Sequence, residues 1–147
     1  MQIVVVPLLF LAGAQPAPGD VPATEVSLSG IHIGDSTSLV ERKLGHPLRI
    51  SNQPDYLNLH YRYKDIIVSF SDGVVAGLFT TSARSCTPKR LCVGDSTKRM
   101  RELYGEPLEA DRETGRYHEY YGTDLACWLQ IPATSDRITS ITVACQP

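Results

Sequence analysis

The side chains that could support catalysis or hold a metal ion are spread along this chain without a recognisable arrangement. The histidines are His32, His46, His60 and His118, and no two of them stand four residues apart with a carboxylate between them. His60 and His118 fall in two predicted strands, but a zinc site would need further ligands from elsewhere in the chain. Nucleophilic catalysis needs a serine or cysteine held beside a base, and phosphate binding needs a glycine-rich loop; neither pattern is recognisable. The sequence therefore predicts a protein that is not an enzyme and that uses no metal ion or cofactor.

The second half of the chain contains four cysteines: Cys86, Cys92, Cys127 and Cys145. Their even number and the absence of a Cys-x-x-Cys pair favour disulfides over a zinc or thiol redox site, and disulfides indicate an exported protein. Among the three connectivities that four cysteines allow, we favour Cys86–Cys92 and Cys127–Cys145. The register of the second pair is open, because Cys145 lies beyond the residue expected opposite Cys127 if Ile138 has the role of Val75.

Since no catalytic or metal-binding pattern is recognisable, the sequence indicates a binding surface. The chain has seven tyrosines and one tryptophan, and most of them lie in predicted strands. Aromatic rings beside an arginine on an uncovered sheet face are typical of the residues that dominate protein–protein binding. The predicted partner-binding residues are Tyr56, His60, Arg62, Tyr120 and Trp128.

The placement of these residues depends on the strand register. Alternation puts Trp128 and Gln130 on the face opposite Leu129, so Trp128 lies on the open face if the apolar set packs under the helices. The alternative is a core position for Trp128 beneath the disulfide. In the preceding strand, a slip of one residue would exchange Tyr120 with Tyr121.

An internal repeat supplies the elements that position these side chains. Residues 31–48 (IHIGDSTSLVERKLGHPL) and 91–108 (LCVGDSTKRMRELYGEPL) have seven identical positions, which indicates one small unit built twice. Ser36 and Ser96 are suited to cap the start of a helix, and Gly45 and Gly105 are suited to end one. Capping accounts for the shared Gly-Asp-Ser-Thr motif, so no catalytic pair is inferred from it.

Three strands are predicted after each helix. In the first repeat they cover residues 56–63, 66–71 and 74–81, with Asp72-Gly73 as a two-residue hairpin turn. In the second repeat they cover residues 116–123, 125–132 and 137–145, and the residues between Glu106 and Glu113 are expected to form a polar loop. The sequence thus predicts an α+β fold. Two repeats, residues 25–85 and 86–147, join their meanders into one sheet with the helices on one face.

The N-terminal residues predict export. Residues 1–14 read as a signal peptide, with an apolar run that ends in Ala12-Gly13-Ala14 as the cleavage site, and residues 15–24 read as a linker. The run is too short to span a bilayer. No Lys or Arg precedes it, so either the terminal amine supplies the positive charge or the start codon lies further upstream. The charge balance, 14 basic against 16 acidic residues, gives no case for nucleic-acid binding.

The order of the shared residues also carries a resemblance to known proteins. Gly-x-Ser/Thr, an apolar helix position, Leu-Gly-x-Pro (Leu44 to Pro47) and an aromatic strand resemble the SmpA/OmlA (BamE) family of outer-membrane assembly lipoproteins. The tandem arrangement in a disulfide-containing exported chain resembles the β-lactamase inhibitory protein. The resemblance covers roughly residues 31–147 and implies two helix–strand modules that form one concave sheet for binding a protein.

These observations together predict a non-catalytic protein-binding module of the bacterial envelope, periplasmic or secreted. It would act as an assembly factor or as an inhibitor through the concave face of its sheet. The alternative prediction is a binder of a small ligand or a cell-wall glycan that uses the same aromatic face.

Overall fold

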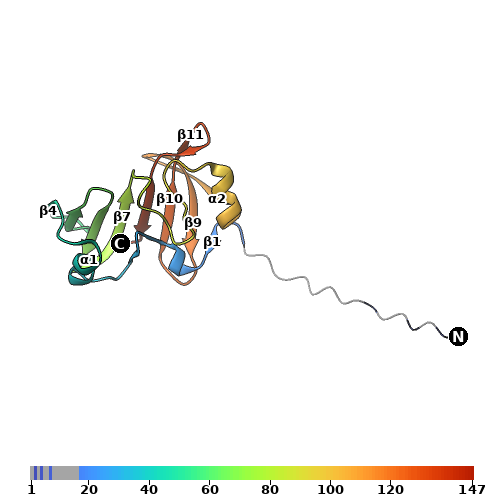
Figure 1. Cartoon of the computed structure of the whole chain (residues 1–147), viewed down its shortest axis with the longest axis horizontal. Coiled ribbons are helices and arrows are strands. Elements are labelled where there is room, and N and C mark those ends of the chain that lie inside the picture. Colours follow the sequence, from blue (N-terminus) through green and yellow to red (C-terminus); the bar gives the residue numbers. More distant parts are fainter. Residues whose placement is uncertain (1, 3, 5–6, 8–16) are drawn as a thin grey trace.

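The computed structural model describes residues 2, 4, 7 and 17–147. The predicted signal peptide, with its cleavage site at Ala12-Gly13-Ala14, otherwise lies outside the described residues. Within the described part, the chain forms two α-helices, a nine-stranded mixed sheet and two small hairpins (Figure 1). The predicted α+β class is confirmed. Neither of these helices is long or apolar enough to cross a membrane.

The helices are α1 (Thr37–Leu44), α2 (Thr97–Tyr104) and the 3-10 helix η1 (Ala23–Glu25). The large sheet contains β1 (Asp20–Val21), β4 (Arg49–Asn52), β5 (Leu59–Arg62), β6 (Ile67–Ser71), β7 (Val74–Thr80), β8 (Leu108–Arg112), β9 (Gly115–Gly122), β10 (Cys127–Ile131) and β13 (Ile141–Cys145). The small hairpins are β2 (Ser27–Leu28) with β3 (Ile31–His32), and β11 (Ala133–Thr134) with β12 (Arg137–Ile138).

Both helices begin and end where the sequence predicts. The Ser36 hydroxyl accepts a hydrogen bond from the Leu39 amide (3.2 Å), and the Ser96 hydroxyl accepts one from the Arg99 amide (3.1 Å). These bonds satisfy amide groups that have no partner inside the first helical turn. Gly45 ends α1 and the equivalent glycine ends α2, with φ of 83° and 78°, a conformation that favours glycine.

The sheet joins the two halves of the chain through its middle. The strand order is β1-β9-β10-β13-β7-β6-β5-β4, and β8 pairs with β9 as well. Strands β13 and β7 pair antiparallel at the centre, so the strands after α1 lie on one side and those after α2 on the other. The pairing of β1 with β9 is parallel, which makes the sheet mixed.

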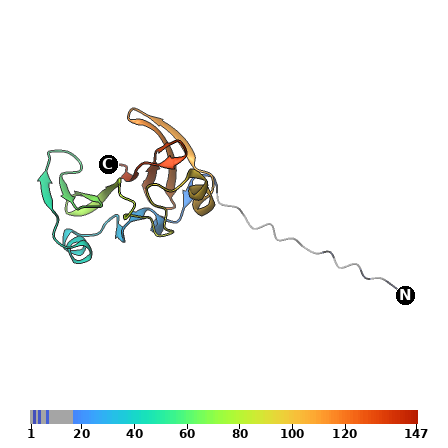
Figure 2. The same ribbon diagram turned by 45° about the horizontal axis from the view of Figure 1, so that its top comes forward.

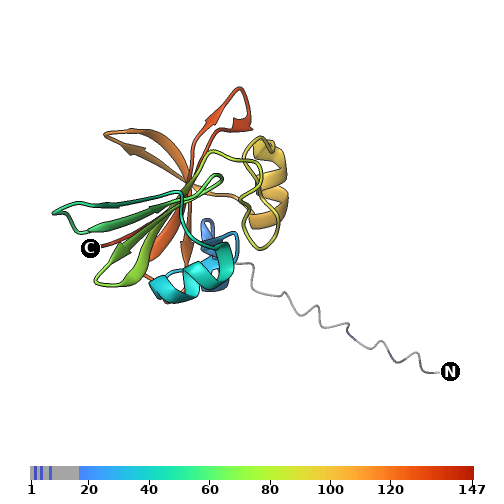
Figure 3. The same cartoon turned by 60° about the vertical axis from the view of Figure 1, so that its left-hand side comes forward.

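The core lies between the helices and one face of the sheet. Figures 2 and 3 show both α-helices on the same side, while the β8–β9 hairpin and the β4 edge extend to the other side (Figure 2, Figure 3). Val40 of α1 and Met100 of α2 are fully buried and belong to one hydrophobic core with Leu78, Leu129 and Ile141 of the sheet. Burial of such apolar side chains is the main stabilising contribution to the fold.

The structure contains both favoured disulfides, Cys86–Cys92 and Cys127–Cys145. Cys127 and Cys145 lie directly opposite each other on β10 and β13. Ile138 does have the role of Val75, since each carbonyl accepts a hydrogen bond from a motif glycine amide (2.9 and 2.8 Å). A one-residue register shift between the β11–β12 hairpin and the β10–β13 pair therefore brings Cys145, rather than its neighbour, opposite Cys127. The β6–β7 pair has the same kind of shift, at Ser69/Phe70.

The prediction of a three-stranded meander in each half omitted one strand, because each half has one more strand than predicted. Strand β4 precedes β5, which begins at Leu59 rather than Tyr56, and strand β8 occupies the segment predicted as a polar loop. Both added strands carry polar side chains on both faces, so they show no alternation of apolar and polar residues. In the segment predicted as a linker, residues 20–21 form β1 and η1 begins at Ala23.

Candidate functional site

The candidate site is the face of the large sheet that neither α1 nor α2 covers, which we call the open face. One row of directly opposed side chains crosses this face from edge to edge. In spatial order the row consists of Arg49, Arg62, Ile67, Phe79, Thr142, Gln130, Glu119 and Leu108. With about 4.8 Å between neighbouring strands, the row is roughly 34 Å long.

A second row lies beside the first and leaves a hollow in the middle of the open face. It consists of Ser51, His60, Ser69 and Gly77 in the first half, and of Ala144, Trp128 and Tyr121 in the second. Small side chains at its centre line a cavity of about 190 Å³, whose rim includes Tyr56 and Phe79. A Cβ atom on Gly77 would lie 3.4 Å from the Leu57 side chain, so the loop before β5 rests on this centre.

Glu119 anchors the second half of the open face through a fully satisfied carboxylate. Arg112 binds it with both arms, from Nε to Oε2 and from Nη2 to Oε1, each at 2.7 Å. The Tyr121 hydroxyl donates to Oε1 (2.6 Å), and the Gln130 amide donates to Oε2 (3.1 Å). Glu119 has no solvent exposure, yet each of its oxygens has two donors, which compensates for the burial of the charge.

The pKa of Glu119 depends on two opposing influences, burial and hydrogen bonding. Burial is the largest single influence and would raise the pKa, but hydrogen bonds from Arg112, Tyr121 and Gln130 together outweigh it and lower the pKa below the ordinary value. The same contact with the carboxylate raises the pKa of Arg112. At neutral pH both groups of the pair are therefore charged, and their hydrogen bonds orient the neighbouring side chains.

Trp128 lies on the open face and packs on this ion pair. Its ring stacks on Tyr121 with a centroid distance of 5.5 Å, and the Arg112 guanidinium lies 5.4 Å from the ring centroid. The indole Nε1 is buried and has no hydrogen-bond partner in the described part of the chain. Trp128 is thus a half-buried member of a rigid aromatic platform, rather than a core residue beneath the disulfide.

The structure brings three other predicted residues to the rim or surface of the open face. His60 and Arg62 lie on it as predicted, and His60 Nδ1 is 2.8 Å from the Ser69 hydroxyl. Its Nε2 atom is buried and has no partner among the described residues. Tyr56 is 45% exposed but belongs to the loop before β5, not to the strand.

The predicted position of Tyr120 is corrected by the register of β9. Tyr120 is opposite Leu129 and wholly buried on the helix side, where its hydroxyl donates to the Gly105 carbonyl (2.7 Å). Burial raises the pKa of this tyrosine. Tyr121 takes the place on the open face, because neighbouring residues of a strand point to opposite faces.

Sequence reasoning missed the residues that join these side chains into one surface. They are Arg49, Phe79, Arg112 and Glu119. The alternation of Tyr117, Glu119 and Tyr121 along one strand face was a usable signal for Glu119. Arg112 had no such signal, because its strand was not predicted.

The structure separates the two histidines that sequence analysis considered for a metal site. His60 lies on the open face, whereas His118 lies on the helix side, 2.7 Å from Glu109 Oε1. Among the described residues, no group of three or more His, Cys, Asp or Glu side chains is arranged to hold a metal ion.

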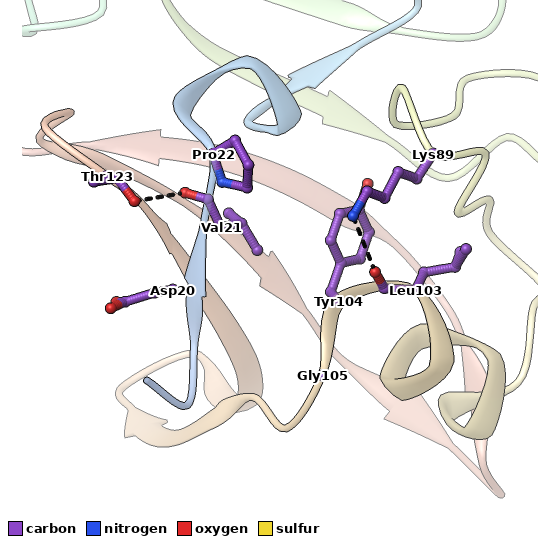
Figure 4. Close-up of a pocket in the computed structure, with 8 residues that line it drawn as sticks. All are labelled: Asp20, Val21, Pro22, Lys89, Leu103, Tyr104, Gly105 and Thr123. Atoms are coloured by element: carbon purple, nitrogen blue, oxygen red, sulfur yellow. Dashed lines mark hydrogen bonds between the residues drawn. The ribbon is translucent and has the colours of Figure 1, made fainter. Parts of the chain in front are cut away.

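A cavity of about 680 Å³ lies away from the open face, between β1 and the end of α2 (Figure 4). Its lining is formed by Asp20, Val21, Pro22, Lys89, Leu103, Tyr104, Gly105 and Thr123. The Lys89 ammonium bonds the Leu103 carbonyl (3.4 Å) and lies 5.4 Å from the Tyr104 ring centroid. The lining thus combines apolar side chains with two charged residues, Asp20 and Lys89.

The fold is one that also occurs in extracellular bacterial proteins. An extracellular protein containing a SCP domain from Bacillus anthracis matches 95% of this chain with a TM-score of 0.56 and 11% identity. A cysteine-rich secretory protein from Staphylococcus aureus matches 78% of the chain (TM-score 0.55, 14% identity). A DUF4309 family protein, YjgB, from Bacillus subtilis matches 87% of this chain and 88% of its own (TM-score 0.55, 13% identity).

These similarities correct the family resemblance drawn from the sequence. The match is to the extracellular SCP-domain and DUF4309 proteins, and the resemblance to the SmpA/OmlA (BamE) family and to the β-lactamase inhibitory protein is wrong. The residues behind that resemblance are caps and turns, which recur in unrelated α+β proteins. No family model matches the chain, and no curated protein sequence is significantly similar to it.

The comparisons show that the fold is shared, and the two longer proteins are matched over only part of their length. The chain spans about half the length of the first two proteins, covering 50% and 44% of them. Both are described as extracellular or secretory, and the two disulfides are consistent with export. The two disulfides of this chain agree with the predicted periplasmic or secreted location.

Proposed function

We propose that the protein is an exported, non-catalytic binding module of the bacterial envelope that engages a protein partner through its open face. The observation that carries the proposal is the platform of Trp128, Tyr121 and Arg112, which the buried Glu119 holds in one geometry. Side chains that are already fixed lose little conformational entropy on binding. An aromatic and arginine surface prepared in this way is the composition of a binding hot spot.

The size of the open face supports a protein as the partner. The first row is roughly 34 Å long, and Phe79 near its middle is 39% exposed. A standard protein–protein interface buries about 800 Å² on each partner, which a face of this length can supply. A small molecule would cover only a fraction of the row.

A non-catalytic role is supported by how the titratable groups are used. Both oxygens of Glu119 are occupied by donors, so this carboxylate is not available to exchange protons with a substrate. The cysteines are oxidised in disulfides and offer no thiolate. The open face therefore has the properties of a recognition surface.

We also propose that the two halves are copies of one unit, and that the open face arises where the copies join. The support is a matched set of contacts: the Gly34 amide bonds the Val75 carbonyl, and the Gly94 amide bonds the Ile138 carbonyl. The helix caps of the two halves also agree. Each half alone would be a sheet of four strands with a small core, and a larger folded unit buries a greater fraction of its surface.

Site-specific photocrosslinking tests the protein-binding function. A benzophenone amino acid replaces Phe79 on the open face, and in the matched control it replaces Lys98 of α2, whose side chain is 86% exposed. We expect one dominant crosslinked protein from position 79 and none from position 98, in cells that make the protein. Equal crosslinking from both positions, or crosslinking only from α2, would overturn the assignment of the open face.

A second candidate function is the binding of a small ligand or a cell-wall glycan. The Trp128–Tyr121 stack could hold a sugar ring, and the cavity between β1 and α2, at about 680 Å³, has the volume of a ligand pocket. A ligand that binds the folded state raises its melting temperature by mass action. A higher melting temperature in the presence of cell-wall fragments, together with no crosslinked protein from position 79, would favour this function over protein binding.

A further inference from the structure

The open face carries two arginines that lie opposite each other and have no salt-bridge partner in the described part of the chain. Arg49 of β4 and Arg62 of β5 are directly opposed in the antiparallel register. Among the described residues, neither forms a salt bridge or a side-chain hydrogen bond. By contrast, four other arginines each face a carboxylate: Arg99, Arg101, Arg112 and Arg116.

The arginine pair lines a cavity whose described lining residues offer hydrogen-bond donors and include no Asp or Glu. The cavity has a volume of about 330 Å³, and its lining is formed by Arg49, Ser51, Gln53, His60, Arg62 and Ile67. Two guanidinium groups, a hydroxyl and a side-chain amide all offer hydrogen atoms to a ligand. The unpartnered Nε2 of His60 belongs to the same lining.

Folding alone does not account for this arrangement. Like charges directly opposite each other on neighbouring strands destabilise the pair. A charged residue on an edge strand protects the sheet from pairing with other chains, which would explain Arg49 on β4, the last strand of the sheet. It does not explain why Arg62 presents a second positive charge beside it. An anion placed between the two guanidinium groups would remove the repulsion.

We propose that this cavity is the docking site for a carboxylate-bearing segment of the protein partner. The inference rests on the proposed function and adds the chemistry of the partner. A guanidinium group binds a carboxylate through two parallel hydrogen bonds, and two opposed arginines can hold one carboxylate between them or two in succession. Ile67 and Phe79 follow Arg62 along the same row, so the segment presents an apolar side chain next to its acidic one.

The test measures binding of a hexaglutamate peptide to the full chain by nuclear magnetic resonance, following the arginine Nε–H signals. We expect the Arg49 and Arg62 signals to shift and the affinity to fall as salt rises. Arg49→Gln and Arg62→Gln each weaken binding roughly three- to tenfold. The matched control is Arg116→Gln, which removes the same charge from a side chain that is 67% exposed and paired with acids, and it leaves the affinity unchanged.

Stability separates a binding role from a structural one. Removing either opposed arginine relieves repulsion, so the melting temperature of Arg49→Gln and Arg62→Gln stays equal or rises. A lower melting temperature together with unchanged peptide affinity would show a structural role and overturn the proposal. Equal signal shifts at Arg116, or binding of inorganic phosphate without binding of hexaglutamate, would overturn it as well.

The same variants distinguish this inference from the proposed function. If the crosslink from position 79 persists in the Arg49→Gln/Arg62→Gln double variant at full yield, the open face binds a protein and the acidic docking site is wrong. If hexaglutamate binds at the arginine pair while position 79 gives no crosslink, the acidic ligand site stands and the protein-binding function is wrong.

Discussion

Replacing Glu119 with glutamine tests whether the buried ion pair holds the open face together. The substitution keeps the shape of the side chain and removes its charge. It leaves the Arg112 guanidinium without a counterion. The NH2 group of the new amide, a hydrogen-bond donor, then faces a side chain that is also a donor. Breaking a buried ion pair by removing one partner costs about 3–5 kcal/mol. Because the Arg112 side chain is 38% exposed and can reach water, we expect the lower end, about 3 kcal/mol.

The assay is urea unfolding at pH 7 with the disulfides intact, compared with the Glu109→Gln variant. Glu109 lies in β8 opposite His118, the residue before Glu119, and its side chain is 36% exposed and pairs with His118, Arg101 and Arg116. Exposed ion pairs contribute little, so this control loses less than about 1 kcal/mol. For a domain of this size, about 3 kcal/mol corresponds to a fall in melting temperature of roughly 10 °C.

The pH dependence gives an independent check. The folded-state pKa of Glu119 is lowered from its ordinary value of 4.5. The stabilisation is therefore fully present above pH 4.5, and it is lost as the pH falls through the lowered folded pKa. The stability difference between the wild type and Glu119→Gln is thus largest at neutral pH and narrows in acid. A difference below about 1 kcal/mol at pH 7, or one that widens in acid, would refute the reasoning.

Three further predictions concern the scaffold. Replacing Cys127 and Cys145 with serine lowers the free energy of unfolding by about 3 kcal/mol in the chain-entropy treatment, measured by urea unfolding against the oxidised wild type. Gly45→Ala and Gly105→Ala each cost about 1–3 kcal/mol. Their backbones share a positive φ near 80° with open space beside them, and unequal costs would contradict the proposal that the halves are copies. Tyr120→Phe removes the hydrogen bond to the Gly105 carbonyl and costs about 1 kcal/mol, and a thermal melt indistinguishable from wild type would show that this bond contributes nothing.

The features that could be predicted from the sequence are those with local causes. Ser36 and Ser96 cap their helices because the capping oxygen and the amide it binds are three residues apart. The Asp72-Gly73 turn closes its hairpin because both residues adopt a positive φ, 50° and 84°. Neither feature depends on the rest of the fold, so short patterns of residue types were sufficient.

The strands at the two edges could not be predicted in this way. Both β4 and β8 have polar residues on each face, since edge strands contact fewer core residues. Their omission hid Arg49 and Arg112, and with them the row that crosses the open face. The pairing of Arg49 with Arg62 is a property of register, which only the folded sheet defines.

Strand register also explains why a prediction can be wrong by one position along a strand. Tyr120 and Tyr121 are both aromatic and adjacent, so composition could not decide which of them faces the core. The burial of Glu119 was hidden for a related reason. Its donors come from three different strands, β8, β9 and β10, and a buried carboxylate is stable only when all of them are in place.

The two halves of the open face differ in charge, and under the proposed function this difference would set the orientation of the partner. Near one end of the first row the Arg112–Glu119 pair is neutral, whereas at the other end Arg49 and Arg62 have no salt-bridge partner among the described residues. A partner rotated by half a turn would place its acidic segment on the aromatic platform. There it would find the Arg112 guanidinium already bound to a carboxylate and would lose the charge contact. Under the proposed protein-binding function, the side chains of the joined sheet would therefore favour one orientation of the partner over the other.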